Sequence, residues 1–131
     1  MKYILMMSGT KAQFEEYTKW PKQDLQANFA FMHAFNKELR ESGVLVATEG
    51  LAFPHEAKLI RGAPDGTPIT DGVFPESKEF LAGYWIVDVE GPEQAYQIAA
   101  RASLAPGPGG VRGGQPIEVR AILGSAPKEL L

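Results

Sequence analysis

The chain has 131 residues, a length typical of one domain, and its 44% hydrophobic and 22% charged residues exclude a disordered chain or a fibre. With 13 Lys and Arg against 16 Asp and Glu, the net charge of −3 does not provide the basic surface that nucleic-acid binding requires. The absence of cysteine excludes disulfides, thiolate nucleophiles and cysteine-ligated metal sites. We expect one domain over residues 1–124 and a tail over 125–131.

The first half of the chain predicts a strand followed by a long helix. The apolar run over residues 2–7 is typical of a buried central strand. Polar and aromatic residues alternate over 10–20, and Trp20-Pro21 breaks any helix begun there, so no helix is expected before Pro21. From Pro21 on, apolar residues recur at three- and four-residue steps and predict a helix over about 22–42, ended by Gly43.

The second half predicts short strands, one helix and a glycine-rich segment. Proline and glycine over residues 106–114 indicate a mobile loop. The other predicted elements are strands over 44–52, 57–61, 68–70, 80–89 and 117–123 and a helix over 91–103, with Asp65-Gly66 as the turn of a small hairpin.

This order predicts an α+β domain of the ferredoxin-like βαββαβ type, with an antiparallel sheet, two helices on one face and a small extra hairpin. The uncovered face should then present Tyr3, Tyr84 or Ile86, and Ile117. Because an apolar sheet face of this size is not left in water, we expect a homodimer in which two sheets pack face to face.

Two histidines are candidates for chemistry. His33 lies one step off the apolar stripe of the long helix, so it is either a boundary residue of the core or an acid–base group facing a cleft. His55 follows Phe53-Pro54 in a turn and is expected to be solvated surface. The two histidines lack the spacing of metal ligands, so no metal site is expected.

The segment over residues 70–79 concentrates charge beside an aromatic residue. Asp71 can turn the chain, and Glu76 and Lys78 can then point the same way. One interpretation is a solvated turn that Phe74 plugs, and the other is a packed loop that contributes binding residues.

Further charged candidates lie on strands. Glu118 and Arg120 share a face of the last strand, and Arg61 ends an earlier one, so each arginine either forms a structural ion pair or holds a carboxylate ligand. The glycines between 107 and 114 lack the strand-to-helix context and the Lys-Ser/Thr pair of a phosphate loop.

Five segments together carry a family resemblance. They are Met1-Lys2-Tyr3-Ile4-Leu5, Gly50-Leu51, the segment from Thr70 to Glu79, Ala82-Gly83-Tyr84, and Ile117-Glu118-Val119-Arg120. With them the chain resembles the YCII-related proteins that carry the DGPF motif, over about residues 1–123. Val73 stands where that motif has proline, which frees a backbone N–H.

The resemblance implies a dimeric α+β barrel, a superfamily with muconolactone isomerases, small monooxygenases and haem-dependent dismutases. It also implies a His–Asp pair in a cleft, which His33 and Asp71 would supply here. One related lineage is a dehydrochlorinase of a chlorinated aromatic. DGPF proteins are often encoded beside extracytoplasmic-function sigma factors, which implies a regulatory or stress context.

Two hypotheses about function follow. In the first, a cofactor-independent lyase or isomerase uses His33 as base and Asp71 or Glu76 to orient it, while Arg120 or Lys78 holds a small anionic or aromatic substrate, with Arg61, Phe74 and Glu118 also in its binding site. In the second, the protein catalyses nothing and binds a small ligand or a protein partner such as a sigma factor. Neither hypothesis needs a cofactor.

The chain shows no signal peptide and no apolar run near the ~20 residues of a membrane span. We therefore expect a cytoplasmic protein.

Overall fold

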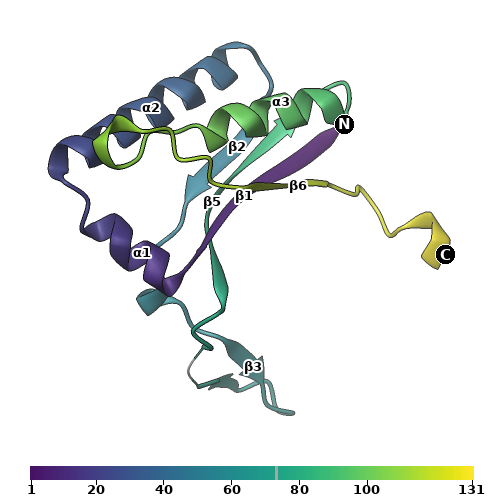
Figure 1. Ribbon diagram of the computed structural model, residues 1–131. Helices are drawn as coiled ribbons and strands as arrows, with labels where there is room; N and C mark the ends of the chain where they lie inside the picture. Colours follow the sequence, from purple (N-terminus) through teal and green to yellow (C-terminus); the bar gives the residue numbers. More distant parts are fainter. Residues whose placement is uncertain (73) are drawn as a thin grey trace.

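The computed structural model describes residues 1–72 and 74–131. These residues form a four-stranded antiparallel sheet, three α-helices and a separate two-stranded hairpin, which confirms the predicted α+β class (Figure 1). The strands of the sheet run in the order β2-β5-β1-β6. The elements are β1 (Lys2–Thr10), α1 (Lys11–Thr18), α2 (Lys22–Glu41), β2 (Leu45–Gly50), β3 (Ile60–Gly62), β4 (Pro68–Thr70), β5 (Glu79–Asp88), α3 (Pro92–Ser103) and β6 (Ile117–Ala121), with short 3-10 turns at Pro54–Glu56, Pro108–Gly110 and Lys128–Leu130.

The core lies between one face of the sheet and the helices α2 and α3, which cross it side by side (Figure 1). The central strands β1 and β5 supply its floor, where Leu5 pairs with Trp85 and Tyr3 with Val87. The helix α2 contributes Phe35 and Leu39, and α3 contributes four small or aliphatic residues: Ala95, Ile98, Ala99 and Ala102. Burial of these apolar side chains is the main force that holds the two layers together.

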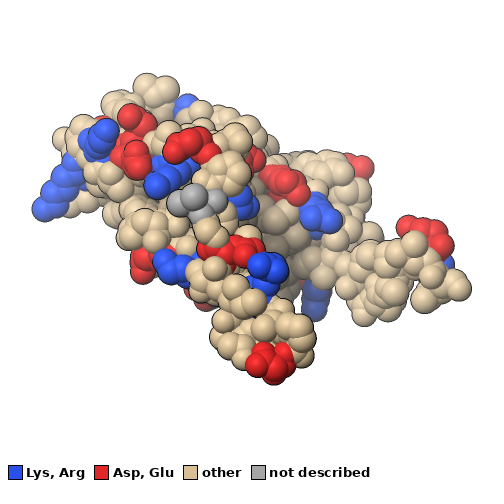
Figure 2. Space-filling view, turned by 90° about the horizontal axis from the view of Figure 1, so that it is seen from below, with Lys and Arg blue, Asp and Glu red and all other residues tan. Residues whose placement is uncertain are grey.

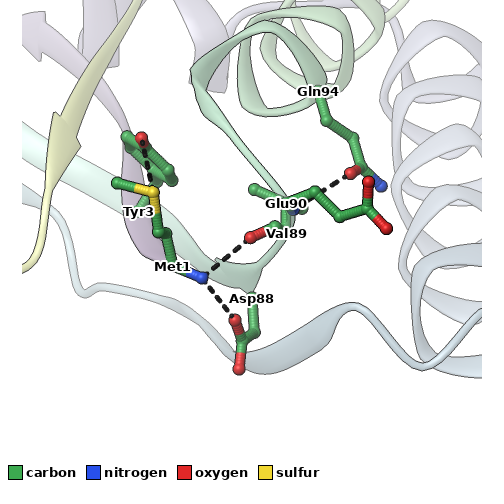
Figure 3. Close-up of polar contacts among 6 residues, drawn as sticks. All are labelled: Met1, Tyr3, Asp88, Val89, Glu90 and Gln94. Atoms are coloured by element: carbon green, nitrogen blue, oxygen red, sulfur yellow. Dashed lines mark hydrogen bonds and ion pairs between the residues drawn. The ribbon is translucent and has the colours of Figure 1, made fainter.

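The start of β1 is tied to the end of β5. The ammonium group of Met1 donates hydrogen bonds to Asp88 Oδ1 at 3.1 Å and to the Val89 carbonyl at 2.8 Å (Figure 3). Just beyond them, the Glu90 N–H donates to Gln94 Oε1 at 3.3 Å, where α3 begins. The two bonds of Met1 support the register of the central strands at this end of the sheet.

Helix α1 corrects the expectation that no helix precedes Pro21. A capping box stabilises its first turn: the Gln13 N–H donates to Thr10 Oγ1 at 3.3 Å, and the Thr10 N–H donates to Gln13 Oε1 at 2.8 Å. The break predicted at Trp20-Pro21 is real, but it separates α1 from α2.

The segment over residues 106–114 has more local structure than the loop that its composition predicts. It contains a 3-10 turn at Pro108–Gly110, and the Gly107 N–H donates to the Val111 carbonyl at 2.7 Å. Two side chains of α2 fasten it: Asn28 Nδ2 donates to the Pro106 carbonyl at 3.0 Å, and Asp24 Oδ2 accepts from the Gly109 N–H at 3.1 Å. Glycine is needed at position 109 because its φ is +70°.

The uncovered face of the sheet differs in part from the prediction. Tyr3 is buried in the core and Ile117 packs against it, so both lie on the helix side. Tyr84 and Ile86 lie on the other face, where they pair with Met6 and Ile4. Along β1 and β6, the side chains that were expected on the uncovered face therefore point toward the helices, and their neighbours occupy the uncovered face.

Strands β3 and β4 form a hairpin arm that projects from the body of the molecule (Figure 1). The arm confirms the predicted hairpin, although its first strand begins at Ile60 rather than at residue 57. The motif position Val73 lies outside the described residues. Beyond Ile122, whose N–H donates to the Lys2 carbonyl at 2.9 Å, the chain runs away from the body to its C-terminus (Figure 1).

No helix in the described parts of the chain combines the length and apolar character needed to cross a membrane.

Candidate functional site

A cavity of about 820 Å³, larger than the one beside the hairpin arm, lies on the helix side of the sheet. Its walls come from the ends of β1 and β2, the middle of β5, the helices α1 and α2, the end of α3 and the glycine-rich segment 105–115. A cavity of this size accommodates a small organic molecule.

Aromatic side chains form one wall of this cavity, which we call the aromatic wall: Phe14, Tyr17, Trp20, Phe29 and Phe53. The Tyr17 ring packs edge-on against three of them, with centroid distances of 4.9 Å to Trp20 and 6.4 Å to Phe29 and to Phe53. Phe14 meets Phe53 at 5.7 Å. Phe29 belongs to the predicted apolar stripe of α2, yet its side chain is 54% exposed because it borders the cavity rather than the core.

Burial raises the pKa of the Tyr17 phenol above its ordinary value of 10.0. The phenol is therefore neutral at physiological pH and retains an O–H that can donate a hydrogen bond.

The floor of the cavity carries polar groups that are held by the sheet. Trp85 Nε1 donates to Asn36 Oδ1 at 2.7 Å, and Thr48 Oγ1 donates to the Tyr84 carbonyl at 2.9 Å. These bonds join α2 to β5 and β2 to β5, so the floor is set by the same elements that build the core.

Charge is sparse around this cavity. Among the residues that the structure describes, Glu49 and Arg112 are the only acidic and basic side chains that line it, and both are exposed. Figure 2 shows Lys and Arg interspersed with Asp and Glu over the face seen from below, so neither sign of charge gathers there.

The two residues expected to form a His–Asp pair lie in different parts of the molecule. His33 is an exposed residue of α2 and, as far as the chain is described, lines neither cavity. Asp71 lies at the base of the arm, where both its carboxylate oxygens accept from Arg61 Nε at 2.9 and 3.1 Å. Helix α2 and the arm lie at opposite ends of the molecule (Figure 1).

A second cavity of about 550 Å³ lies beside the arm and is lined by three of the predicted site residues, Asp71, Phe74 and Glu76. His55, expected to be solvated surface, is exposed and also borders this cavity. In residues 1–72 and 74–131, no three His, Asp or Glu side chains are grouped as metal ligands.

In the loop after Asp71, Phe74 is half-buried while Gly72 and residues 75–79 are exposed, which agrees with the interpretation of a solvated turn that Phe74 plugs. The Phe74 ring meets Phe80 edge-on at 5.0 Å, and Lys78 Nζ lies 5.2 Å from the centre of the Phe80 ring. Lys78 also donates to the Glu79 carbonyl at 3.1 Å.

Glu118 and Arg120 share a face of β6, as expected, and their charged groups are 4.0 Å apart. Both side chains are exposed on the uncovered face of the sheet, opposite Met6 and Ile4. An exposed pair of this kind contributes little to stability.

The comparison with protein families finds that the YCII-related domain matches residues 1–111. The chain belongs to the YCII-related family. No curated protein matches the chain.

The match spans the elements of this YCII-related domain from β1 to α3, and with them the whole aromatic wall. No role was predicted for the aromatic wall, of which Phe14, Tyr17 and Trp20 lie in the segment 10–20 where no helix was expected. The signal that would have found it is the pattern Thr10-x-x-Gln13, a capping box, followed by aromatic residues at Phe14 and Tyr17 on one helix face.

Proposed function

We propose that this YCII-related protein binds a planar, mostly apolar small molecule in its larger cavity. The observation that carries the proposal is the aromatic wall, which presents five rings to a cavity of about 820 Å³. Ligand sites in proteins are typically apolar concave surfaces of about this size with few polar groups, and aromatic rings bind flat ligands by stacked and edge-on contacts.

Binding is favoured over the lyase or isomerase scheme. General acid–base catalysis needs a base within hydrogen-bond reach of the substrate and a group that orients the base. The positions of His33 on α2 and of Asp71 at the arm do not support such a pair.

Intrinsic fluorescence tests this function directly, because both tryptophans of the chain, Trp20 and Trp85, line the cavity. We expect naphthol to change the emission of the wild-type protein with saturation. Tyr17→Ala and Phe29→Ala should each weaken the binding roughly tenfold, since each removes a ring from the wall. The control His55→Ala, at the second cavity, should bind as the wild type does.

Absence of a saturable emission change with naphthol and related bicyclic compounds would refute the binding function. If the wild type consumed a bound compound and His33→Ala did not, the acid–base scheme would take its place.

We also propose that two copies of the chain pair through the uncovered sheet face, as in a dimeric α+β barrel. Ile4 beside Ile86 and Met6 beside Tyr84 form an apolar strip on that face. Charged residues flank this strip: Lys2 and Asp88, and Glu118 and Arg120. An apolar centre with a charged rim is the usual anatomy of a protein interface.

The segment from Thr70 to Glu79 supports membership of the DGPF subgroup.

A further inference from the structure

The bond between Trp85 and Asn36 fixes the orientation of an amide at the cavity. An indole N–H only donates, so the atom of Asn36 that faces Trp85 at 2.7 Å is the oxygen. The amide nitrogen Nδ2 is therefore turned away from Trp85.

This nitrogen is accessible to solvent, and its residue lines the cavity. Among the described residues, none accepts a hydrogen bond from Asn36 Nδ2. In the same residues, every fully buried side-chain nitrogen or oxygen atom has a hydrogen-bond partner. Asn36 is half-buried, and its Nδ2 has no partner, so this nitrogen cannot be one of the fully buried atoms. It is therefore accessible to solvent. Asn36 lines the larger cavity, so Nδ2 offers a hydrogen-bond donor to whatever occupies it.

Two further amides that line the cavity are bonded to the protein through the nitrogen rather than the oxygen. Asn28 Nδ2 donates to the Pro106 carbonyl at 3.0 Å, and Gln115 Nε2 donates to the Ser8 carbonyl at 2.9 Å. Because carbonyl groups only accept, each of these amides donates one of its two N–H groups to the protein, and the oxygens Asn28 Oδ1 and Gln115 Oε1 remain as acceptors.

We propose that the ligand is an aromatic molecule that carries both a carbonyl or carboxylate oxygen, bound by Asn36 Nδ2, and a hydroxyl or amine group, bound by Asn28 Oδ1 or Gln115 Oε1. The inference rests on the proposed binding function and specifies the class of its ligand. Asn36 then selects for the ligand's acceptor, and Trp85 is a positioning residue that holds the Asn36 amide in the required orientation.

Three bicyclic probes separate these contributions. Acetylnaphthol carries an acceptor and a donor, acetylnaphthalene only the acceptor, and ethylnaphthol only the hydroxyl on a ring of matched size. By calorimetry we expect the wild type to bind acetylnaphthol roughly tenfold to a hundredfold more tightly than either of the others, because each of these leaves a polar group of the cavity unpaired.

Variants assign the acceptor preference to Asn36. Asn36→Asp keeps an oxygen for Trp85 but replaces the Nδ2 donor with an acceptor, so the preference for acetylnaphthol over ethylnaphthol should vanish. Trp85→Phe frees the Asn36 amide to turn, which should reduce that preference without abolishing it. The control Gln26→Glu makes the matched charge change at an exposed position of α2 and should leave the preference intact.

The results distinguish the two levels of the proposal. If no probe binds the wild type, the binding function itself fails. If all three bind the wild type with equal affinity, or if Asn36→Asp keeps the wild-type preference, the binding function stands and the assignment of the ligand class is overturned.

Discussion

Gly83 shows how closely two strands approach beside the cavity. It pairs with Gly50 across β5 and β2, and a Cβ atom at position 83 would lie 2.9 Å from the Glu49 carbonyl oxygen. That oxygen belongs to the backbone and cannot turn aside as a flexible side chain would. Glycine at this position is therefore required by the strand pairing that shapes the cavity floor.

Gly83→Ala should lower the free energy of unfolding by about 1–3 kcal/mol, the usual cost of an overpacked site. The neighbouring Gly50→Ala is the matched control, because a Cβ there meets no atom within 4 Å. Urea denaturation followed by circular dichroism measures both variants. Equal urea midpoints of unfolding for the two variants would show that β2 can move away from position 83 without loss of stability.

Tyr17 gives the aromatic wall a dependence on pH. Since burial raises the pKa of its phenol in the folded state, the folded protein favours the neutral form. The contribution of the neutral phenol to folding stability is fully present below pH 10.0, the ordinary pKa that applies in the unfolded state. This contribution is lost as the pH rises through the higher pKa of the folded state. Unfolding between pH 9 and 12 should show a steeper decline for the wild type than for Tyr17→Phe. The exposed Tyr96→Phe should behave as the wild type does.

Helix α1 has eight residues, none of them buried, and it depends on its cap and on aromatic contacts. A helix this short is unstable on its own, so its first turn matters more than in α2. It nevertheless carries two rings of the aromatic wall, Phe14 and Tyr17. The stability of α1 and the integrity of the cavity are therefore linked.

Thr10→Ala removes half of the capping box and should destabilise α1 by about 1 kcal/mol. Hydrogen exchange of the amides of Phe14–Tyr17 should quicken accordingly, and naphthol binding should weaken. Thr18→Ala at the other end of the same helix loses one local bond to the Glu15 carbonyl and should have a smaller effect. Unchanged exchange in Thr10→Ala would mean that the aromatic contacts alone hold the helix.

The elements that the sequence predicted well are those whose own periodicity is strong. Strands β1 and β5 and helices α2 and α3 lie within a few residues of their expected bounds. The local structure of the glycine-rich segment was not predicted, because the bonds that order it come from Asn28 and Asp24, which lie 78 and 85 positions away from their partners. The cavity could not be predicted for the same reason, since distant segments meet to form its walls.

The uncovered sheet face is the feature that concerns the molecule as a whole. The alternation of side chains along the strands predicted that the uncovered face would be apolar, but Tyr3 and Ile117 were assigned to that face and lie on the other. The assignment failed because both faces of β1 carry large apolar side chains. Tyr84 and Ile86 were placed correctly. Which face the helices cover is decided by packing against Phe35 and Leu39 of α2, and a single strand does not reveal that.

Sedimentation velocity at micromolar concentration should show a dimer of the wild-type chain. Ile86→Glu places a charge in the apolar strip and should yield monomers that keep the wild-type helix content, because Ile86 lies outside the core. Leu123→Glu, at a side chain that is 62% exposed beyond β6, is the control and should remain dimeric. A monomeric wild type would exclude the pairing of sheets.

The hairpin arm also makes the chain easy to extend. Its tip is a short turn closed by the Ala63 N–H, which donates to the Thr67 carbonyl at 2.8 Å, and its strands join none of the main sheet. An epitope or fluorescent domain spliced between Asp65 and Gly66 would have both ends close together and would project away from α2 (Figure 1). The protein could then be anchored to a sensor surface by this tip while small molecules reach the other end freely.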